Sequence, residues 1–268
     1  MAFEFHKNPQ KYLQHQYLNT LKSTIPFIKT HHTKAKNYFD TLNILELGCG
    51  EGGNLLPFAE MGANCVGIDL NKVKIEQGKN IMADVIKSGK LTLYYDDIFN
   101  PEIEAKFTNR FDIILLKDVI EHIPHKDKAL EQMKKYLNDD GLLFVGFPPW
   151  YMPFGGHQQI CNNRFLGVLP WMHLLPKSLY IGFVKCFDEP KNVTDELAEL
   201  VDFGVTINHL HRLANAVNLK IVARQYYFIN PIYEYKFGFK TRLLSPILAN
   251  LPYVRDFLTT SAYYLLGK

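Results

Sequence analysis

The sequence lacks the features of several specialised protein classes. Its four cysteines form no Cys-x-x-Cys pair, and its ten histidines form no His-Glu-x-x-His or paired Cys/His spacing. We therefore expect neither a disulfide framework nor a bound metal. No run of about 18 apolar residues occurs, which predicts that no segment spans a bilayer. The start of the chain lacks the uninterrupted apolar core of a signal peptide, so we expect a cytoplasmic protein.

The chain also lacks a large excess of charge of either sign. The chain has 30 Lys and Arg residues against 27 Asp and Glu residues, which leaves a net charge of +3. So small an excess does not predict a nucleic-acid partner. With 47% apolar residues in 268, the chain has enough material for a substantial core. Its length allows one α/β domain with an insertion or two small domains, and we expect one. The sequence does not indicate an oligomeric state.

What the sequence does contain, from residue 42 onward, is an alternation of short apolar runs and longer amphipathic segments. This pattern is typical of βαβ units and a parallel sheet. The expected strands span residues 43–47, 64–69, 91–95, 111–117, 142–147, 220–228 and 262–266. The expected helices span residues 9–25, 54–61, 71–87, 126–138 and 206–218. We therefore predict a Rossmann-like α/β fold with a mostly parallel seven-stranded sheet and helices on both faces.

The pattern divides the predicted single domain into four parts. Residues 9–40 form an N-terminal helical segment, 42–149 a cofactor-binding core, 150–205 an insertion and 206–268 a part that completes the sheet. The insertion is dense in proline, glycine and aromatic residues, which predicts a lid over an apolar or aromatic acceptor. The alternative is that its large side chains form a small core of their own.

A glycine-rich turn follows the first expected strand. The stretch Glu46-Leu-Gly48-Cys49-Gly50-Glu-Gly-Gly53 lets a ligand approach the backbone and meet unpaired N–H groups. The same glycines also satisfy the dinucleotide fingerprint G-x-G-x-x-G. Glu46 favours a different ligand, because a buried carboxylate suits the ammonium and sulfonium of S-adenosylmethionine (SAM) better than a pyrophosphate. The alternative for Glu46 is that it only ties down loop amides.

Acidic residues end the next two strands. Asp69 follows the second strand, where a carboxylate can accept both hydroxyls of a ribose. Asp96 and Asp97 follow the third strand, where one carboxylate and the N–H of Ile98 can meet an adenine. Carboxyl ends of parallel strands share one edge of the sheet, and ligands of open α/β sheets bind there.

In this order, the segments ELGCGEGGN, VGIDL, DDI, FDIILLKDVIEHI and NDDGLLFVGFP resemble the class I SAM-dependent methyltransferases. Within that family they are most similar to the small-molecule branch with the ubiquinone and menaquinone type enzymes. The resemblance covers residues 42–149 and implies SAM as cofactor and S-adenosylhomocysteine (SAH) as product. The cofactor-binding residues it implies are Glu46, Gly48, Cys49 and Gly50 around the methionine part, Asp69 at the ribose, Leu70, Asp97 (or Asp96) and Ile98 at the adenine, and Lys117 at the methyl-donor end.

Methyl transfer from a sulfonium needs alignment of the acceptor more than reactive side chains. A hydroxyl acceptor gains from a general base, and we predict His157 for that role, because flanking glycines let its loop reach the site. The alternative is that His157 packs within its loop, and for His122 and His173 we favour such a structural role. We expect a small apolar or aromatic acceptor and favour O-methylation.

Three further interpretations stay open from the sequence. Residues 243–258 carry prolines among leucines and can contact a membrane surface or pack on the sheet. The glycine spacing and Asp69 also fit an NAD(P)-dependent oxidoreductase. The third alternative is a non-catalytic SAM-binding module that holds a partner through its aromatic insertion.

Overall fold

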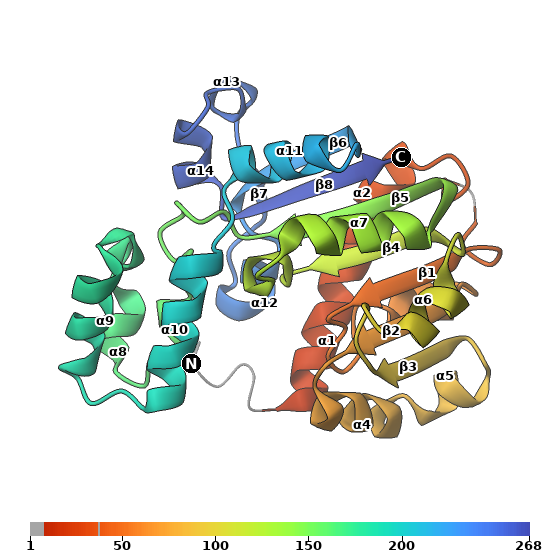
Figure 1. The fold of residues 1–268 in the computed structure, drawn as a ribbon, viewed down its shortest axis with the longest axis horizontal. Helices are drawn as coiled ribbons and strands as arrows, with labels where there is room; N and C mark the ends of the chain where they lie inside the picture. The colour runs from red at the N-terminus through yellow and green to blue at the C-terminus, as the bar shows by residue number, and fades with distance from the viewer. Residues whose placement is uncertain (1–7, 37) are drawn as a thin grey trace.

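One eight-stranded sheet runs through the molecule in the order β3-β2-β1-β4-β5-β8-β6-β7 (Figure 1). The computed structural model describes residues 8–36 and 38–268. The strands are β1 (Asn43–Leu47), β2 (Asn64–Asp69), β3 (Leu91–Tyr95), β4 (Phe111–Lys117), β5 (Leu137–Phe147), β6 (Lys220–Ile229), β7 (Arg242–Leu243) and β8 (Ser261–Gly267). The first five are parallel, whereas β8 runs antiparallel to both β5 and β6.

The predicted Rossmann-like, mostly parallel sheet is confirmed, and all seven expected strands are present. The predicted count of seven is wrong, because β7 adds an eighth strand at the edge of the sheet. This strand has only two residues, which pair with Tyr227 and Ile229 of β6. Two residues are too few for an alternating pattern, so only the tertiary pairing identifies them as a strand.

Helices cover both faces of the sheet. The α-helices are α1 (Pro9–Asn19), α2 (Ile25–His31), α3 (Leu56–Glu60), α4 (Lys72–Ile81), α5 (Ala83–Lys87), α6 (Pro101–Phe107), α7 (Lys126–Tyr136), α8 (Arg164–Val168), α9 (Lys177–Lys185), α10 (Lys191–Phe203), α11 (Ile207–Ala216), α12 (Ile232–Phe237), α13 (Pro246–Ala249) and α14 (Val254–Leu258). A π-helical turn η2 (Thr20–Thr24) and 3₁₀ turns η3 (Ile120–His122), η4 (Gln158–Ile160) and η5 (Met172–Leu174) complete the set.

The N-terminal helix is longer than the sequence predicts. Asn8 caps it as expected, with its side chain accepting from the N–H of Lys11 at 3.1 Å. The helical path then continues through η2 and α2 to His31 rather than ending at Ile25. Pro26 lacks an N–H and would clash with the preceding turn of a regular α-helix. The wider π-helical turn just before it lets the chain pass the proline without a break.

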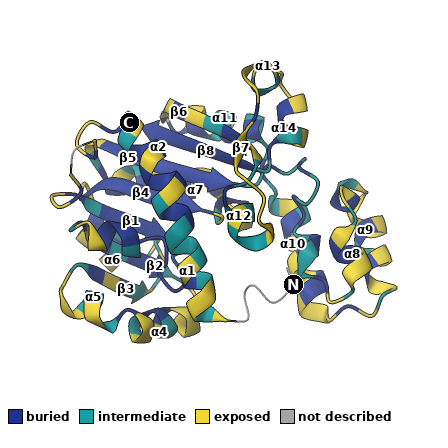
Figure 2. Cartoon of the chain, turned by 180° about the vertical axis from the view of Figure 1, so that it is seen from behind, coloured by how far each residue is buried: buried dark blue, intermediate teal, exposed yellow. Residues whose placement is uncertain are grey.

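The core lies on both faces of the sheet. Every residue of β4 is buried, and Figure 2 shows the central strands in the buried colour. Leu45 and Ile114 point to the cluster under α7 and α11, whereas Ile44 and Ile113 point to the cluster under α2 and α3. Burial of each such side chain contributes about 1.5–3 kcal/mol to folding. The rigid centre therefore includes the strands whose ends carry the expected site.

The insertion between β5 and α11 forms a helical group beyond the carboxyl ends of the parallel strands (Figure 1). It has a hydrophobic core of its own, made of Cys161, Leu166, Met172, Tyr180, Val184, Val193 and Leu197. The large side chains that suggested a lid are divided. Phe147 belongs to the core of the sheet, Met172 to the core of the insertion, and Phe165 and Trp171 are exposed. A lid over the acceptor stays a prediction.

Candidate active site

The glycine-rich turn after β1 has the backbone geometry that only glycine adopts readily. Gly48 has φ +66° and donates its N–H to the carbonyl of Ile68 on β2 at 2.8 Å. A Cβ on Gly48 would lie 2.5 Å from Val119, and one on Gly53 would lie 2.6 Å from Gln16 of α1. The turn is thus packed between the end of β4 and the N-terminal helix, which leaves it little freedom to move.

Glu46 lies buried in β1 and is 1% exposed. Its Oε1 accepts from the side-chain amide of Asn54 at 2.7 Å, and its Oε2 has no hydrogen-bond partner among the described residues. Asn54 in turn accepts from Lys117 at 3.2 Å and from Thr20 at 2.8 Å. Burial raises the pKa of Glu46, while Asn54 and Lys117 oppose that rise. The observed partner of Glu46 is therefore a side chain rather than the loop amides, and one carboxylate oxygen is left to meet a cation.

Asp69 stands at the end of β2 and braces the loops on both sides. Its Oδ2 accepts from the N–H of Gly50 at 2.7 Å, and its Oδ1 accepts from the N–H of Asn71 at 2.7 Å. Each carboxylate oxygen keeps a second lone pair, so these bonds leave room for two hydroxyl donors. Leu70 beside it is 70% exposed, an open apolar surface next to the turn.

The two acids after β3 are not equally open. Oδ1 of Asp96 already accepts from the N–H of Asp97 (2.8 Å) and from the side chain of Asn100 (2.9 Å). Oδ1 of Asp97 accepts once, from the N–H of Phe99 at 2.9 Å, and Asp97 is exposed. Ile98 packs against the core beneath them. Because the N–H of Asp96 bonds the carbonyl of Asp69, the acids of β2 and β3 lie at one edge, as the sequence predicts.

Two residues at this edge were missed in the sequence. Asp118 follows Lys117 with φ +54°, a conformation that is unusual for a residue with a side chain and that gathers at functional sites. Its side chain is exposed at the carboxyl edge of the sheet. Tyr12 of α1 has a pKa raised by burial and then by Asp118, Glu51 and Glu46, so it lies among these carboxylates. Neither backbone strain nor this approach of α1 is visible in a sequence.

His157 lies at the start of η4 with φ +53°. Its Nε2 is 4.0 Å from Oε1 of Glu121, and its ring centroid is 5.4 Å from that of His122. Glu121 is buried, and neither of its carboxylate oxygens has a hydrogen-bond partner among the described residues. Burial raises the pKa of Glu121. Glu121 lies in η3, just after the end of β4. Its carboxyl group and the imidazole of His157 therefore form a carboxylate–histidine pair.

His173 has the structural surroundings that the sequence suggested. It is buried, its Nε2 lies 2.7 Å from the carbonyl oxygen of Trp150, and the two rings meet edge to face at 4.6 Å. The insertion reaches the site instead through α10, which packs against η3. Glu196 of α10 and His122 of η3 both interact electrostatically with Lys74 of α4. Helix α10 and the turn η3 are therefore in contact, and Lys74 contributes to the electrostatic surroundings of both.

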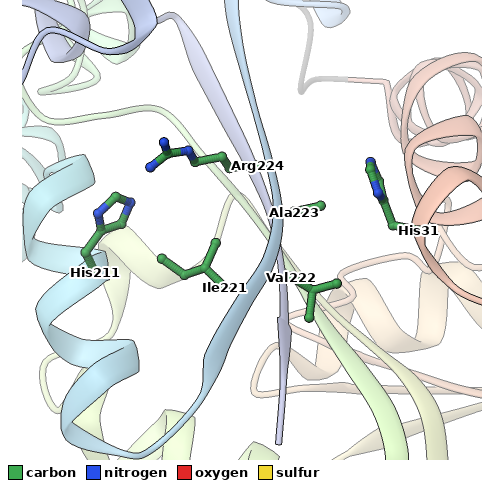
Figure 3. A pocket seen from close by; sticks show the side chains of 6 residues that line it. All are labelled: His31, His211, Ile221, Val222, Ala223 and Arg224. Carbon is green, nitrogen blue, oxygen red and sulfur yellow. The ribbon is translucent and has the colours of Figure 1, made fainter.

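A hollow elsewhere on the surface is not part of this site. It has a volume of about 470 Å³ and follows β6, with His211 of α11 on one side and His31 of α2 on the other (Figure 3). Ile221 of β6 lines it and pairs with Leu266 of β8, which pairs in turn with Leu143 of β5. Leu143 lies away from the carboxyl end of β5. The hollow is therefore three strands away from β4 and lies toward the other end of the sheet.

In the part of the chain that the structure describes, no group of three or more His, Cys, Asp and Glu side chains is arranged to hold a metal ion. Likewise, no helix in residues 8–36 and 38–268 has the length and hydropathy needed to cross a membrane.

The glycine turn, Glu46 and the acids after β2 and β3 lie within a segment that matches a known family. The model of that family, described as a methyltransferase domain, matches residues 10–152, more than half of the chain. The chain belongs to this methyltransferase family. The predicted class I SAM-dependent methyltransferase is thus confirmed, and SAM is the cofactor of this class. The oxidoreductase interpretation of the glycine spacing is set aside.

Two relatives from different organisms share one name. The ubiquinone biosynthesis O-methyltransferase of Pelagibacter ubique (strain HTCC1062) is 33% identical over 104 residues, 39% of this chain and 41% of that protein. That of Bartonella tribocorum (strain CIP 105476 / IBS 506) is 35% identical over 183 residues, 65% of this chain and 67% of that protein. The match to this chain spans less than half of the length of the first curated relatives.

A solved structure supports the fold. PKMT2 from Rickettsia typhi in complex with AdoHcy superposes with a TM-score of 0.54 and 19% sequence identity, over 94% of this chain and 53% of that chain. At this identity the likeness concerns the fold alone.

Proposed function

We propose that this protein transfers a methyl group from SAM to an oxygen atom of a small apolar or aromatic acceptor. One observation carries the donor half of the proposal. Glu46 is buried beside the glycine turn with one carboxylate oxygen that meets no hydrogen-bond donor of the described chain. Such an atom is costly to bury unless a ligand supplies a cation, and the amino acid part of SAM carries one.

The other proposed contacts with the donor lie at the same edge of the sheet. Glu46, Gly48, Cys49 and Gly50 would hold the methionine part, with Lys117 at the end that carries the methyl group. Asp69 would accept the ribose hydroxyls with its free lone pairs, since its other lone pairs order the loops of Gly50 and Asn71. For the adenine we favour Asp97 over Asp96, because Oδ1 of Asp96 already accepts two hydrogen bonds and Asp97 is exposed. Leu70 and Ile98 would flank the ring.

For the acceptor half, SAM supplies a methyl group that is already activated on a sulfonium. The chain must then align an oxygen nucleophile and remove its proton. His157 is the proposed base, because the buried carboxylate of Glu121 lies 4.0 Å from its Nε2 and would favour the protonated imidazole that forms. O-methylation is supported by the name of the relatives, ubiquinone biosynthesis O-methyltransferase.

The proposed acceptor is lipophilic, and a peripheral contact with a membrane surface would help the enzyme to reach it. Exposed apolar side chains around α13 and α14 support this contact, namely Leu243, Ile247, Leu251, Tyr253, Val254 and Phe257. Phe257 also stacks on Tyr151 at 5.1 Å, which ties this segment to the start of the insertion. A cytoplasmic location remains part of the proposal.

Titration calorimetry with SAH and with NADH tests the donor half. We expect SAH to bind and NADH not to bind, and binding of NADH alone would refute the assignment. Transfer of labelled methyl from SAM to a panel of catechols and phenols with apolar side chains tests the acceptor half. Binding of SAH without methyl transfer to any of them would favour the alternative of a non-catalytic SAM-binding module.

A further inference from the structure

Three elements of the fold are joined by the side chain of Asn54. This residue follows the glycine turn after β1 and is 4% exposed. Its side-chain amide donates to Oε1 of Glu46 in β1 at 2.7 Å, and its Oδ1 accepts from Nζ of Lys117 at the end of β4 at 3.2 Å. The same Oδ1 accepts from Oγ1 of Thr20 in η2 at 2.8 Å. One small side chain thus connects both central strands with the N-terminal helical segment.

The surrounding groups require a hydrogen-bond donor and an acceptor on the same side chain. An ammonium has no acceptor atom, so the atom that faces Lys117 must be the amide oxygen of Asn54. The amide nitrogen then faces Glu46, whose ionised carboxylate only accepts. An aspartate at this position would offer Glu46 no donor, and a leucine would offer neither group. The neighbours of Asn54 therefore fix the orientation of its amide, and the amide fixes the position of Oε1 of Glu46.

Asn54 also lies between two groups of opposite charge. In the sheet, Glu46 pairs with Leu115, and Lys117 is two residues further along β4. Because side chains alternate along a strand, Glu46 and Lys117 point to the same face of neighbouring strands. Lys117 donates to Asn54, and no ion pair joins it to Glu46 in the described chain. A direct pair would occupy the carboxylate that we assign to the methyl donor.

Burial gives these contacts their importance for Glu46. Burial raises the pKa of Glu46, and the hydrogen bond from Asn54 opposes that rise more than the charge of Lys117 does. Oε2 of Glu46 has no hydrogen-bond partner among the described residues. A buried oxygen without a partner costs free energy, which a cationic ligand can recover. Asn54 thus favours the ionised carboxyl group and leaves one of its oxygens open.

We infer that Asn54 is a positioning residue for SAM, which holds Glu46 through Oε1 and keeps Lys117 apart, so that Oε2 of Glu46 receives the ammonium of the amino acid part. This inference rests on the proposed function, which assigns Glu46 to that ammonium. Asn54 acts through Glu46 and not on the reacting atoms. Its effect is therefore confined to the amino acid part of the ligand, because the adenosine part is assigned to Asp69 and Asp97.

Two ligands distinguish this role from a purely structural one. SAH carries the ammonium, whereas 5′-methylthioadenosine carries the same adenosine and a sulfur atom without it. Asn54→Leu lets Lys117 turn to Glu46, so it should weaken SAH binding to the full chain by about 10- to 100-fold in calorimetry, the loss of one charge-assisted hydrogen bond. Its affinity for 5′-methylthioadenosine should equal that of wild type. Equal losses for both ligands would reduce Asn54 to a support of the turn and overturn the inference.

Thr20→Val is a second variant, which conserves the size of a fully buried side chain and decides the question if Asn54→Leu does not fold. It removes one of the two groups that donate to Oδ1 of Asn54. SAH binding should weaken by about 2- to 10-fold, with unchanged binding of 5′-methylthioadenosine.

Asn138→Leu is the matched control for Asn54→Leu. Asn138 also donates its side-chain amide to a buried carboxylate, that of Asp112 at 2.8 Å, but it does so near the start of β5. This variant should bind both ligands like wild type. A loss of SAH binding as large as that in Asn54→Leu would show a general effect of lost stability and would overturn the inference.

The outcomes separate the inference from the function on which it depends. Equal SAH affinity in Asn54→Leu, Thr20→Val and wild type would overturn the role of Asn54 and leave Glu46 as the proposed ligand. Failure of the wild type to bind SAH would overturn the proposed function, and the inference would fall with it.

Discussion

Replacing Glu46 by glutamine should weaken cofactor binding without unfolding the protein. The glutamine keeps an oxygen that accepts from Asn54, the one side-chain hydrogen bond that Glu46 makes to a described residue. It converts the unpartnered oxygen into an amide donor, which would face the ammonium of the ligand. The loss is one charge-assisted hydrogen bond, about 1.5–3 kcal/mol, which corresponds to about 10- to 150-fold in Kd. Titration calorimetry with SAH measures it.

In the protein without ligand, the same substitution should change how the unfolding free energy depends on pH. Because burial raises the folded-state pKa of Glu46, the folded state binds its proton more tightly than the unfolded state. Between the ordinary pKa of glutamate and this raised pKa, stability therefore falls as pH rises. Glu46→Gln removes this contribution, so its unfolding free energy should fall less than that of wild type between about pH 5 and about pH 8. Lys117 keeps its stronger partner, Asp118.

Urea unfolding at the two pH values checks this behaviour, since the other raised carboxylates are shared by both proteins. Glu60→Gln is the control, because Glu60 is exposed and bonded to Tyr17 on the outer surface. It should change neither SAH affinity nor pH dependence. A Glu46→Gln protein that binds SAH within about twofold of wild type would refute the assignment of Glu46 to the donor ammonium.

Three further changes test other parts of the site. Asp69→Ala should weaken SAH binding by about 1–3 kcal/mol, because the ribose and the N–H of Gly50 both lose their acceptor, and unchanged affinity in calorimetry would contradict the register. His157→Ala should lower turnover and leave SAH affinity intact, so full activity would remove it as the base. Gly48→Ala should lower the unfolding free energy by about 1–3 kcal/mol, since its Cβ would lie 2.5 Å from Val119 at φ +66°, and a thermal midpoint equal to wild type would show that the turn can rearrange.

The sequence predicted those parts of the site that depend on neighbours along the chain. A buried strand, a glycine turn and a terminal acid occur within a few residues of one another, so Glu46, Gly48 and Asp69 could be placed without a structure. The carboxyl ends of parallel strands share one edge, which also brought Asp96 and Asp97 to the same edge as Asp69. Local sequence pattern was sufficient because the fold repeats one connection, in which a strand, a turn and a helix lead to the next parallel strand.

Boundaries and irregular segments depended on more than local pattern. The helix that passes Pro26 through a π-helical turn, and the two-residue strand β7, both need tertiary partners to exist. The large side chains of the insertion looked alike in the sequence. Only packing separated Phe147 in the sheet core and Met172 in the core of the insertion from the exposed Trp171.

By itself, then, the sequence determined the class of fold, the family and the sheet edge at which we propose that the donor binds, because hydrophobic periodicity and turn glycines act over short distances. The tertiary structure alone decided which side chains from distant segments meet near that edge. Tyr235 of α12 stacks on His15 because α12 docks on α1, and Glu121 lies near His157 because the insertion folds back on η3. Contacts between segments that are distant along the chain arise from how elements pack, and no local pattern encodes them.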